Sequence, residues 1–353
     1  MKMTKYPSID QFRTIIKQVK DATSYVGKDE NGDPIFDVTR TAPTLTFTGT
    51  VKLHGTNSSV CFTFGDYGNF WCQSRERIIT PQSDNAGFAA YVEYNREAYR
   101  KLFEKIEKEL YGTSDRNPIY SGAAIYGEWC GGNIQKGVGV NGLPKMFVVF
   151  GIKLLSKDSE EKNEWLSNEN VEALIGNHPE INLYNIFEFG QYSIDIDFNR
   201  PDLSQNTLID MTIAIEEECP VAKYFGIEGG TGEGLVWSCS QFDKNYRFKT
   251  KGEKHSISKV KVLVPVDIER AKSIYELVDN IVSENRLLQG LDYLRSNNID
   301  LDIVNTGKFI KWVNDDLIRE ELDTVIGSGF EIKEVLGPAS KKSKQWFFDK
   351  IFV

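Results

Sequence analysis

The sequence predicts an α+β fold in which a strand-rich domain built on antiparallel sheet precedes an all-helical domain. Apolar and polar residues alternate with a period of two through most of the first two thirds of the 353-residue chain, as half-buried strands require. From Pro265 onward the apolar residues recur with helical spacing, and the outer faces are charged. We therefore place a domain boundary at residues 262–267, which gives domains of residues 1–262 and 263–353.

The clearest strand is predicted over residues 45–55, with the sequence LTFTGTVKLHG. Its apolar residues fall on one face, and its threonines fall on the other together with Lys52 and His54. Lys52 and His54 therefore point in the same direction from a strand whose opposite face is buried.

Further elements of the first domain follow from the same patterns. Strands at 58–64 and 70–75, joined by the turn GDYGN, predict a hairpin. A helix is predicted around residues 86–110. Four more strands are predicted at 123–129, 146–155, 234–240 and 246–251. In the second domain, helical periodicity extends over 267–297 and 306–326.

Composition excludes several classes of protein. The formal charge of −9 argues against a protein that coats polyanions nonspecifically, although a local basic groove could still contact a nucleic acid. Five cysteines without CxxC spacing indicate reduced thiols rather than a disulfide framework. The chain shows no signal peptide and no apolar run of membrane-spanning length, so we expect a soluble protein of the cytoplasm.

Several familiar chemistries lack their motifs. Neither the P-loop GxxxxGK[ST] nor the serine hydrolase GxSxG is present, and the three histidines have no metal-ligand spacing. The glycine-rich segment GIEGGTGEG at 226–234 precedes a strand rather than a helix, which favours a plain turn over a phosphate-binding loop.

A set of short motifs remains whose residue types suit one another. Lys52 lies in KLHG, Glu128 in AIYGEW, and Glu233 begins EGLVW, while Lys249 and Lys251 leave one face of the strand 246–251. Taken singly, a strand lysine is usually solvated and a glutamate beside a tryptophan is often part of a buried ion pair. Their joint presence in this order favours a functional site.

The order and spacing of these motifs resemble the covalent nucleotidyltransferase superfamily of polynucleotide ligases and capping enzymes, whose nucleophile motif is KxxG. The most specific resemblance is to the nick-sealing RNA ligase 2 family of phages and RNA-editing systems. KLHGTNSS is similar to that family's KxHGTNFS, and CQSRERIITP, YGEWCGGNIQKGV, FVVFGI, EGLVW and FKTK are similar to its later elements. The resemblance covers residues 45–260 and implies an ATP-grasp-like nucleotidyltransferase domain, followed by a helical domain that engages nucleic acid.

The resemblance implies an ATP-dependent RNA ligase that joins a 3′-hydroxyl to a 5′-phosphate through lysyl-AMP and adenylated-RNA intermediates. Its cofactors would be ATP and Mg2+ or Mn2+. Its partner would be RNA, as a nicked duplex or an RNA–DNA hybrid, and we expect a monomer in the cytoplasm, or in the host cytoplasm if the source is viral.

Residue roles follow from the same resemblance. Lys52 would be the nucleophile, with His54, Lys249 and Lys251 as the other catalytic residues. The expected nucleotide-binding residues are Lys52, Leu53, Asn57, Arg75, Glu128, Phe150, Glu233, Lys249 and Lys251. Among them, Phe150 would stack on adenine, and Glu128 and Glu233 would hold the ribose or a divalent cation. Burial and neighbouring cations would favour the neutral, nucleophilic form of a lysine amine.

Three positions depart from the family pattern. Val51 replaces an acidic residue before the nucleophile, which bears on the preference for ATP over GTP. Gly151 replaces an aspartate after the stacking aromatic residue, and Ser238 replaces a lysine, which bears on the efficiency of sealing.

Other functions remain open. A DNA ligase or a capping guanylyltransferase would normally add an OB domain, which the helical tail does not resemble. A catalytically idle nucleic-acid-binding module would not need Lys52, Glu128, Glu233, Lys249 and Lys251 together.

Local positive charge is concentrated around the helical tail. Residues 245–261 carry six basic residues against one acid, and SKKSKQWFFDK near the end adds Lys341, Lys342 and Lys344 beside Trp346 and Phe347. The basic residues favour contacts with RNA phosphates, whereas the aromatic residues could equally pack the last helix.

Overall fold

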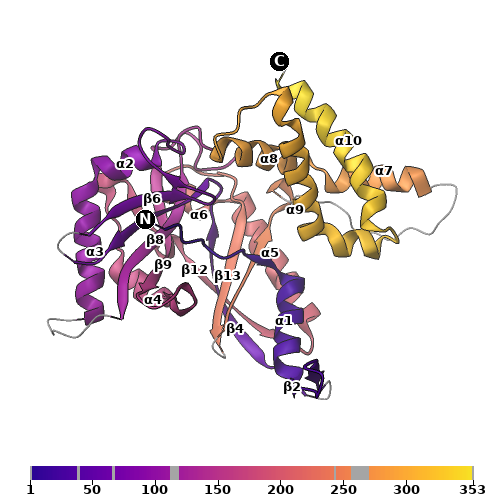
Figure 1. Cartoon of the computed structure of the whole chain (residues 1–353), viewed down its shortest axis with the longest axis horizontal. Coiled ribbons are helices and arrows are strands. Elements are labelled where there is room, and N and C mark those ends of the chain that lie inside the picture. Colours follow the sequence, from indigo (N-terminus) through magenta and orange to yellow (C-terminus); the bar gives the residue numbers. More distant parts are fainter. Residues whose placement is uncertain are drawn as a thin grey trace. The chain divides into compact units, whose positions relative to one another are not determined.

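The structure is a computed structural model that describes residues 2–37, 40–65, 68–111, 119–241, 244–255 and 270–351. The chain forms two compact units, Met1–Gly252 and Glu253–Val353, which we call the strand-rich unit and the helical unit (Figure 1). This arrangement confirms the predicted α+β fold class. The predicted boundary at 262–267 lies outside the described residues.

One sheet of the strand-rich unit has five strands in the order β1-β14-β13-β4-β12. All its pairs are antiparallel except β1 with β14, which is parallel. The strands are β1 (Asp10–Gln11), β4 (Thr44–Lys52), β12 (Gln191–Asp197), β13 (Gly234–Gln241) and β14 (Lys244–Lys251). The strands predicted at 45–55, 234–240 and 246–251 are thus central neighbours in one sheet.

The second sheet follows the order β10-β9-β8-β5-β6-β7, with β11 pairing in parallel with β9. Its strands are β5 (Thr56–Thr63), β6 (Phe70–Ser74), β7 (Ile78–Ile79), β8 (Tyr120–Cys130), β9 (Met146–Ser156), β10 (Glu164–Trp165) and β11 (Leu183–Asn185). β5 and β6 form the predicted hairpin, although residues 66 and 67 of its turn lie outside the described residues. A separate hairpin consists of β2 (Tyr25–Lys28) and β3 (Pro34–Phe36).

Helices cover one face of each sheet. α1 (Phe12–Ser24) and α5 (Gln205–Glu217) pack against the five-stranded sheet, where the Phe12 and Phe248 ring centroids are 5.0 Å apart. α2 (Phe88–Tyr94) and α3 (Arg96–Tyr111) pack against the other sheet, where Phe62 and Phe103 are 5.2 Å apart. The remaining short helices of this unit are α4 (Asn168–Leu174) and α6 (Pro220–Tyr224), with 3-10 turns at Glu160–Lys162, Pro179–Ile181, Ile186–Phe189 and Pro201–Ser204.

The prediction of one continuous helix around 86–110 is wrong, because the helix is interrupted at Asn95. The Asn95 amide side chain donates to the Tyr91 carbonyl, and the Asn95 carbonyl accepts from the backbone of Ala98 and Tyr99. The Tyr91 carbonyl thus accepts from both the backbone N–H and the side chain of Asn95. The chain therefore ends α2 and begins α3 within one residue.

The two-faced character predicted for β4 is confirmed. Leu45, Phe47 and Val51 are buried in the apolar core, while Lys52 at the end of the strand is partly exposed on the opposite face. Phe47 packs on Phe248 of β14 with centroids 5.2 Å apart. Each such buried side chain stabilises the fold by roughly 1.5–3 kcal/mol. The apolar packing therefore holds the polar face of β4, β13 and β14 in place.

The helical unit contains α7 (Arg270–Ile281), α8 (Glu284–Ser296), α9 (Thr306–Gly327) and α10 (Ile332–Ile351), with 3-10 turns at Glu253–His255 and Ile303–Asn305. Its core includes Phe309 and Phe347, whose stacked ring centroids are 4.6 Å apart. Phe347 is fully buried and Trp346 partly buried, so these aromatic residues pack the last helix. The predicted helices at 267–297 and 306–326 correspond to α7, α8 and α9, apart from residues 267–269, which lie outside the described residues.

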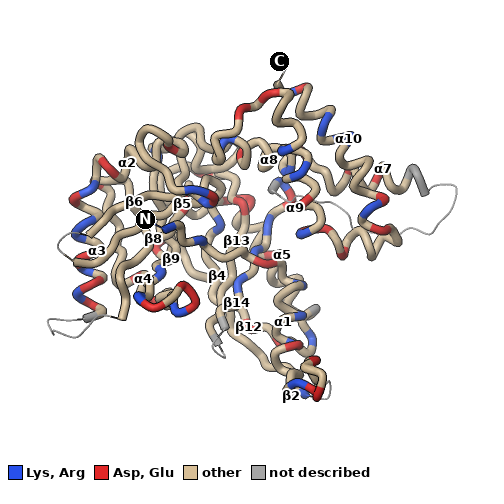
Figure 2. The backbone as a smooth tube through the Cα atoms, viewed as in Figure 1, with Lys and Arg blue, Asp and Glu red and all other residues tan. Residues whose placement is uncertain are grey.

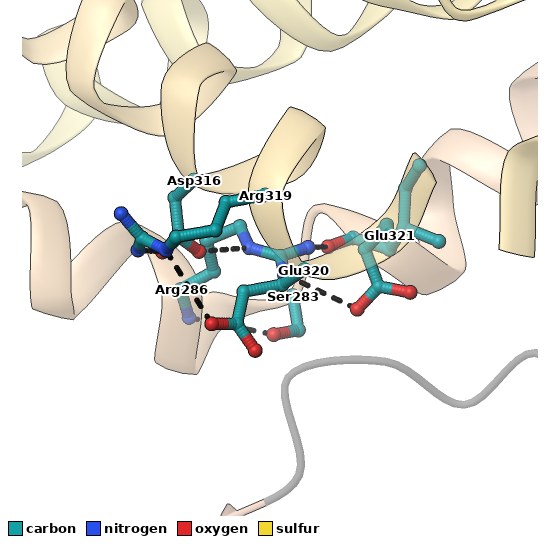
Figure 3. A network of polar contacts seen from close by, with 7 residues as sticks. Ser283, Arg286, Asp316, Arg319, Glu320 and Glu321 are labelled. Carbon is teal, nitrogen blue, oxygen red and sulfur yellow. Dashed lines mark hydrogen bonds and ion pairs between the residues drawn. The ribbon is translucent and has the colours of Figure 1, made fainter. Parts of the chain in front are cut away.

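A buried charged network joins α8 to α9 (Figure 3). The fully buried Arg286 guanidinium donates to Asp316 at 2.9 Å, to Glu321 at 3.2 Å and to the Ile281 carbonyl. Arg319 also pairs with Asp316. Removing one partner of a buried ion pair commonly costs about 3–5 kcal/mol, so this network fixes the register of the two helices.

Acidic and basic residues are interspersed along α3 and along the helices of the helical unit (Figure 2). The described part of the chain has no helix that is both long and apolar enough to cross a bilayer.

Candidate active site

Three adjacent strands bring two lysines to one place. Gly234 of β13 lies opposite Lys52 of β4 on one side and opposite Lys251 of β14 on the other. Directly opposed residues share a face of the sheet, so the lysines flank a position without a side chain. The φ of Gly234 is +142°, and a Cβ there would lie 2.1 Å from the Thr250 carbonyl oxygen. The site therefore requires glycine between the lysines.

Glu233, the residue before Gly234, is the centre of the charged cluster. Its carboxylate accepts a hydrogen bond from Lys52 Nζ at 2.6 Å and pairs with Lys251 Nζ at 3.0 Å. His54 Nδ1 lies 3.7 Å from the same carboxylate. Burial alone would raise the pKa of Glu233, but Lys52, Lys251 and His54 together hold it well below its usual value. Glu233 is thus an anion that positions both lysines.

Glu128 of β8 supports the loop that follows Lys52. Its carboxylate accepts a hydrogen bond from the Gly55 backbone N–H at 2.8 Å. A Cβ at Gly55 would lie 2.4 Å from the Trp129 carbonyl oxygen, so glycine allows the loop to approach β8. Gln135 Nε2 donates to the Gly55 carbonyl at 3.5 Å. Both backbone polar groups of Gly55 are therefore held by side chains.

Burial raises the pKa of the Glu128 carboxyl to about 7; Lys52 opposes this shift, and the nearby charge of Glu233 adds to it. Arg75 also lowers the pKa, which places its charge close enough to act on Glu128, although its side chain is largely exposed. Two carboxyl groups that repel each other beside cations are typical of catalytic sites.

Glu128→Gln is expected to become increasingly stable relative to the wild type as the pH rises from about 4.5 to about 7. The folded pKa of Glu128 lies above its unfolded value, so its stabilising contribution is complete below pH 4.5 and lost as the pH passes 7. Glutamine does not ionise and still accepts the Gly55 hydrogen bond. The difference in unfolding free energy should grow by about 2 kcal/mol, measured by urea unfolding at pH 5 and pH 8 without divalent cations. A difference that does not vary with pH would contradict this assignment.

Three other predicted nucleotide-binding residues lie near this cluster. Lys249 is two residues before Lys251 on the same face of β14. Asn57 lies opposite Glu128 across the β5–β8 pair. Leu53 is buried in the apolar core, so a contact between Leu53 and a nucleotide would come from its backbone.

Phe150 lies in a separate group of aromatic residues on β8, β9 and β10. It is the extra residue of a bulge in β9, between the Tyr126–Gly151 and Gly127–Val149 pairs. Its ring packs edge-on against Tyr6, with centroids 5.0 Å apart, and Tyr6 in turn packs against Tyr126 and Trp165. Bulges re-aim side chains, and this one turns Phe150 toward the aromatic group.

The N-terminal segment completes this group. The Thr4 backbone N–H donates to Gln73 Oε1 at 3.1 Å, and the Tyr126 hydroxyl donates to the Thr4 carbonyl at 2.6 Å. These bonds attach the segment to β6 and β8 and hold Tyr6 against Phe150. This contribution could not be predicted from the sequence, because the segment carries no motif of its own.

The glycine-rich segment 226–234 has a packing role that its sequence did not reveal. A Cβ at Gly230 would lie 2.8 Å from the Ala222 Cβ and 2.9 Å from the Gly139 Cα. Gly139 belongs to the loop after β8, and its N–H donates to the Thr231 carbonyl at 2.8 Å. The two loops that precede Glu233 and follow Glu128 are therefore in backbone contact.

The three departures from the family pattern have distinct surroundings. Val51 is buried in the core, on the face away from Lys52. A Cβ at Gly151 would already lie 3.4 Å from the Trp165 ring, which fills the space a longer side chain would need. Ser238 accepts a hydrogen bond from Asn168 at 3.2 Å.

The described residues contain no group of three or more acidic, histidine or cysteine side chains able to hold a metal ion. Glu128 and Glu233 nevertheless lie close enough for the charge of one to raise the pKa of the other. Mg2+ is often held by one or two carboxylates together with substrate phosphates and water. This pair of carboxylates therefore fits a cation that arrives with a nucleotide.

Residues 45–260, more than half of the chain, match the family model of the RNA ligases. The chain belongs to the RNA ligase family. No curated protein sequence matches it.

The solved structures that resemble this chain in part include three of a Naegleria gruberi RNA ligase. A mutant with AMP and Mn is 15% identical, with a TM-score of 0.43 and coverage of 71% of this chain and 56% of that chain. The ligase with PPi is 16% identical, with the same TM-score and coverage. A mutant with ATP and Mn is 16% identical, with a TM-score of 0.42 and coverage of 71% and 57%. The match thus spans a little over half the length of these ligase chains.

Proposed function

We propose that the protein is an ATP-dependent RNA ligase that joins a 3′-hydroxyl to a 5′-phosphate. Membership of the RNA ligase family supports this function. The single observation that carries it is the cluster in which Glu233 pairs with both Lys52 and Lys251 at the end of the strand that bears the KxHG motif. An idle binding module would have no need for a buried carboxylate held between two partly buried lysines.

In the first step, Lys52 Nζ loses a proton and attacks the α-phosphorus of ATP. A nitrogen–phosphorus bond forms, the bond to the bridging oxygen breaks, and pyrophosphate leaves. Glu233, 2.6 Å from Nζ, orients the amine, and the proton passes to solvent because a carboxylate with so low a pKa is a weak base. Lys251 and Lys249 would neutralise charge that develops on the α-phosphate.

In the following steps the adenylate passes from Lys52 to the 5′-phosphate of an RNA strand, which frees the lysine and creates an activated phosphoanhydride. A 3′-hydroxyl then attacks the RNA phosphate, and AMP leaves. Phe150 would stack on the adenine throughout, and Asn57 and Arg75 would bind the ribose or phosphate. Glu128 and Glu233 would hold Mg2+ or Mn2+, which neutralises the charge of the phosphates when bound.

Lys251→Ala is expected to slow adenylation by about a hundredfold or more, because a positioned cation beside the reacting phosphate would be lost. Lys249→Ala should have an effect of the same sign. Lys223→Ala is the matched control, since Lys223 forms an exposed ion pair with Glu218 outside the site. Rates of AMP transfer to the protein at saturating ATP measure the effect, and unchanged rates in both site variants would assign these lysines to another role.

The experiment that tests the function is the mass of the full chain before and after incubation with ATP and Mg2+. One AMP should be added, labile to acid and stable to base, as a phosphoramidate is. The adenylated protein should then seal a nicked RNA duplex with a 5′-phosphate. An unchanged mass with ATP and with GTP would overturn the proposal, whereas a GMP adduct or exclusive sealing of DNA would favour one of the related functions.

The substrate and surroundings are part of the same proposal. We propose a nick in duplex RNA or in an RNA–DNA hybrid as the substrate, a monomeric protein, and a cytoplasmic location. Five free, buried cysteines are consistent with a reducing compartment. Light scattering during size-exclusion chromatography tests the monomer, and sealing rates on nicked and single-stranded RNA test the substrate.

A further inference from the structure

Arg247 lies on the same face of β14 as Lys249 and Lys251. The three basic residues form a row along the strand, with Arg247 at one end and Lys251 at the other. Arg247 is opposite Ser238 of β13, which in turn is opposite Thr48 of β4. Arg247 is four residues from Lys251, which corresponds to about 13 Å along an extended strand. This separation is comparable to the distance from the phosphate of a nucleotide to the far edge of its base.

The Arg247 guanidinium is held by aromatic rings rather than by acids. Its central carbon lies 5.0 Å from the centroid of the Trp165 ring and 5.6 Å from that of Tyr6. No oxygen within the described ranges accepts a hydrogen bond from its N–H groups. Arginine carries five such donors in a fixed plane. A guanidinium that is oriented in this way but unpaired is suited to bind a ligand with acceptor atoms.

The same aromatic group connects Arg247 to Phe150, the residue predicted to stack on adenine. Tyr6 contacts both the Arg247 guanidinium and the Phe150 ring. At the opposite end of the row, Lys251 shares Glu233 with Lys52. The face of β14 therefore runs from the proposed phosphate end of the site to its proposed base end.

We propose that Arg247 recognises the purine base of the nucleotide by donating a hydrogen bond to a ring nitrogen of adenine. The inference rests on the proposed function, because Lys52 and Phe150 define where the phosphate and the base lie. Arg247 is thereby a specificity-determining residue, and Trp165 is the residue that positions it. Ring nitrogens are the acceptors that adenine offers at its edge.

A role in binding RNA phosphates is the competing assignment, since Arg247 belongs to the basic segment 245–261. Two observations favour the base. The guanidinium lies over the Trp165 and Tyr6 rings, and both rings belong to the group that contains Phe150. Arg247 also shares its strand face with Lys251, which the Glu233 cluster holds beside Lys52.

The test measures the equilibrium affinity of the full chain for AMP and for 1-deaza-, 3-deaza- and 7-deaza-AMP, each of which lacks one ring nitrogen. AMP cannot adenylate the protein, so binding is measured without chemistry. One analogue should bind the wild type about ten- to a hundredfold more weakly than AMP, as expected when a hydrogen bond to a charged donor is lost. Arg247→Met should weaken the binding of AMP to a similar extent. In this variant, AMP and the analogue that the wild type binds weakly should have the same affinity.

Arg96→Met is the matched control, because Arg96 also lies over an aromatic ring, Phe70, at 5.0 Å, on α3. Arg96→Met should leave the affinities for AMP and for the three deaza analogues unchanged. Arg247→Lys keeps the charge but loses the planar donors, so it should give an intermediate affinity and guards against misfolding of the methionine variant. Trp165→Leu should still bind AMP, but the difference in affinity between AMP and the weakly bound deaza analogue should be smaller than in the wild type.

Adenylation kinetics separate base recognition from chemistry. Arg247→Met should raise the KM for ATP and leave kcat within about twofold, since a contact remote from the phosphorus contributes equally to ground and transition states. The inference is overturned if all three deaza analogues bind the wild type as tightly as AMP does. It is also overturned if the weaker binding of one analogue persists in Arg247→Met, or if this variant loses affinity for RNA alone. Wild-type protein that binds AMP with the expected analogue pattern but forms no adduct would instead contradict the proposed ligase activity.

Discussion

Lys52→Ala is expected to abolish the AMP adduct, with a loss of at least about 10⁴-fold in the rate of adenylation. The reason is that, in the proposed mechanism, Lys52 Nζ supplies the electron pair for the new bond to phosphorus, and the neighbouring Lys251 is held by the other oxygen of Glu233. Intact-mass measurement after incubation with ATP and Mg2+ detects the adduct directly.

Lys52→Arg provides the control for this experiment. The guanidinium keeps the positive charge beside Glu233, so the ion-pair cluster and the fold are preserved, but a guanidinium is not a useful nucleophile at neutral pH. Both variants should therefore lack the adduct, while only the alanine variant loses stability. Formation of an adduct in the arginine variant would show that another residue is the nucleophile.

A chain that ends at Val264 is expected to retain adenylation of Lys52 and to lose nick binding and strand joining. The Glu233 cluster and the aromatic group around Phe150 lie entirely in the strand-rich unit, which has its own apolar core. The helical unit has a separate core and exposes lysines on α10, including Lys341 and Lys344. Adduct formation, gel-shift binding of a nicked RNA duplex and sealing are measured on the same protein.

The point-variant control combines Lys341→Ala with Lys344→Ala in the full chain. RNA affinity should fall, and the dependence of the affinity on salt should become shallower by about one to two in the logarithmic slope. Adenylation in the absence of RNA should not change. Unimpaired joining by the shortened chain would remove the helical unit from the mechanism, and loss of adenylation would show that it is needed by the first unit.

The strands that carry motifs could be predicted because their pattern is local. In β4 the alternation of apolar and polar residues reflects a buried and a partly exposed face, and the burial of Phe47 and Val51 follows it. β12 was missed although Ile194 and Ile196 alternate correctly. Its aspartates are disfavoured in strands, and only the pairing with β4, where Thr46 donates to Asp195 at 2.6 Å, accounts for them.

The charged residues of the candidate site could be predicted from the sequence, but the aromatic residues that pack around it could not. Lys52, Glu233 and Lys251 are recognisable from short motifs, and cross-strand register brings them together. Tyr6 and Trp165 lie in segments without any motif, and their contacts with Phe150 and Arg247 arise only from the tertiary structure. The spacing of residues along the chain contains no information about such contacts.

The parallel pairing of β1 with β14 determines when, during synthesis on the ribosome, the candidate site can form. Asp10 and Gln11 emerge before the other strands of this sheet but pair with Phe248 and Lys249, near the end of the strand-rich unit. Until β13 and β14 have been made, β4 has only β12 as a neighbour in its sheet. Contacts between such distant segments form slowly. Between the synthesis of β4 and that of β13, a nascent chain therefore exposes Lys52 without Glu233, and the candidate site is among the last parts of the strand-rich unit to be completed.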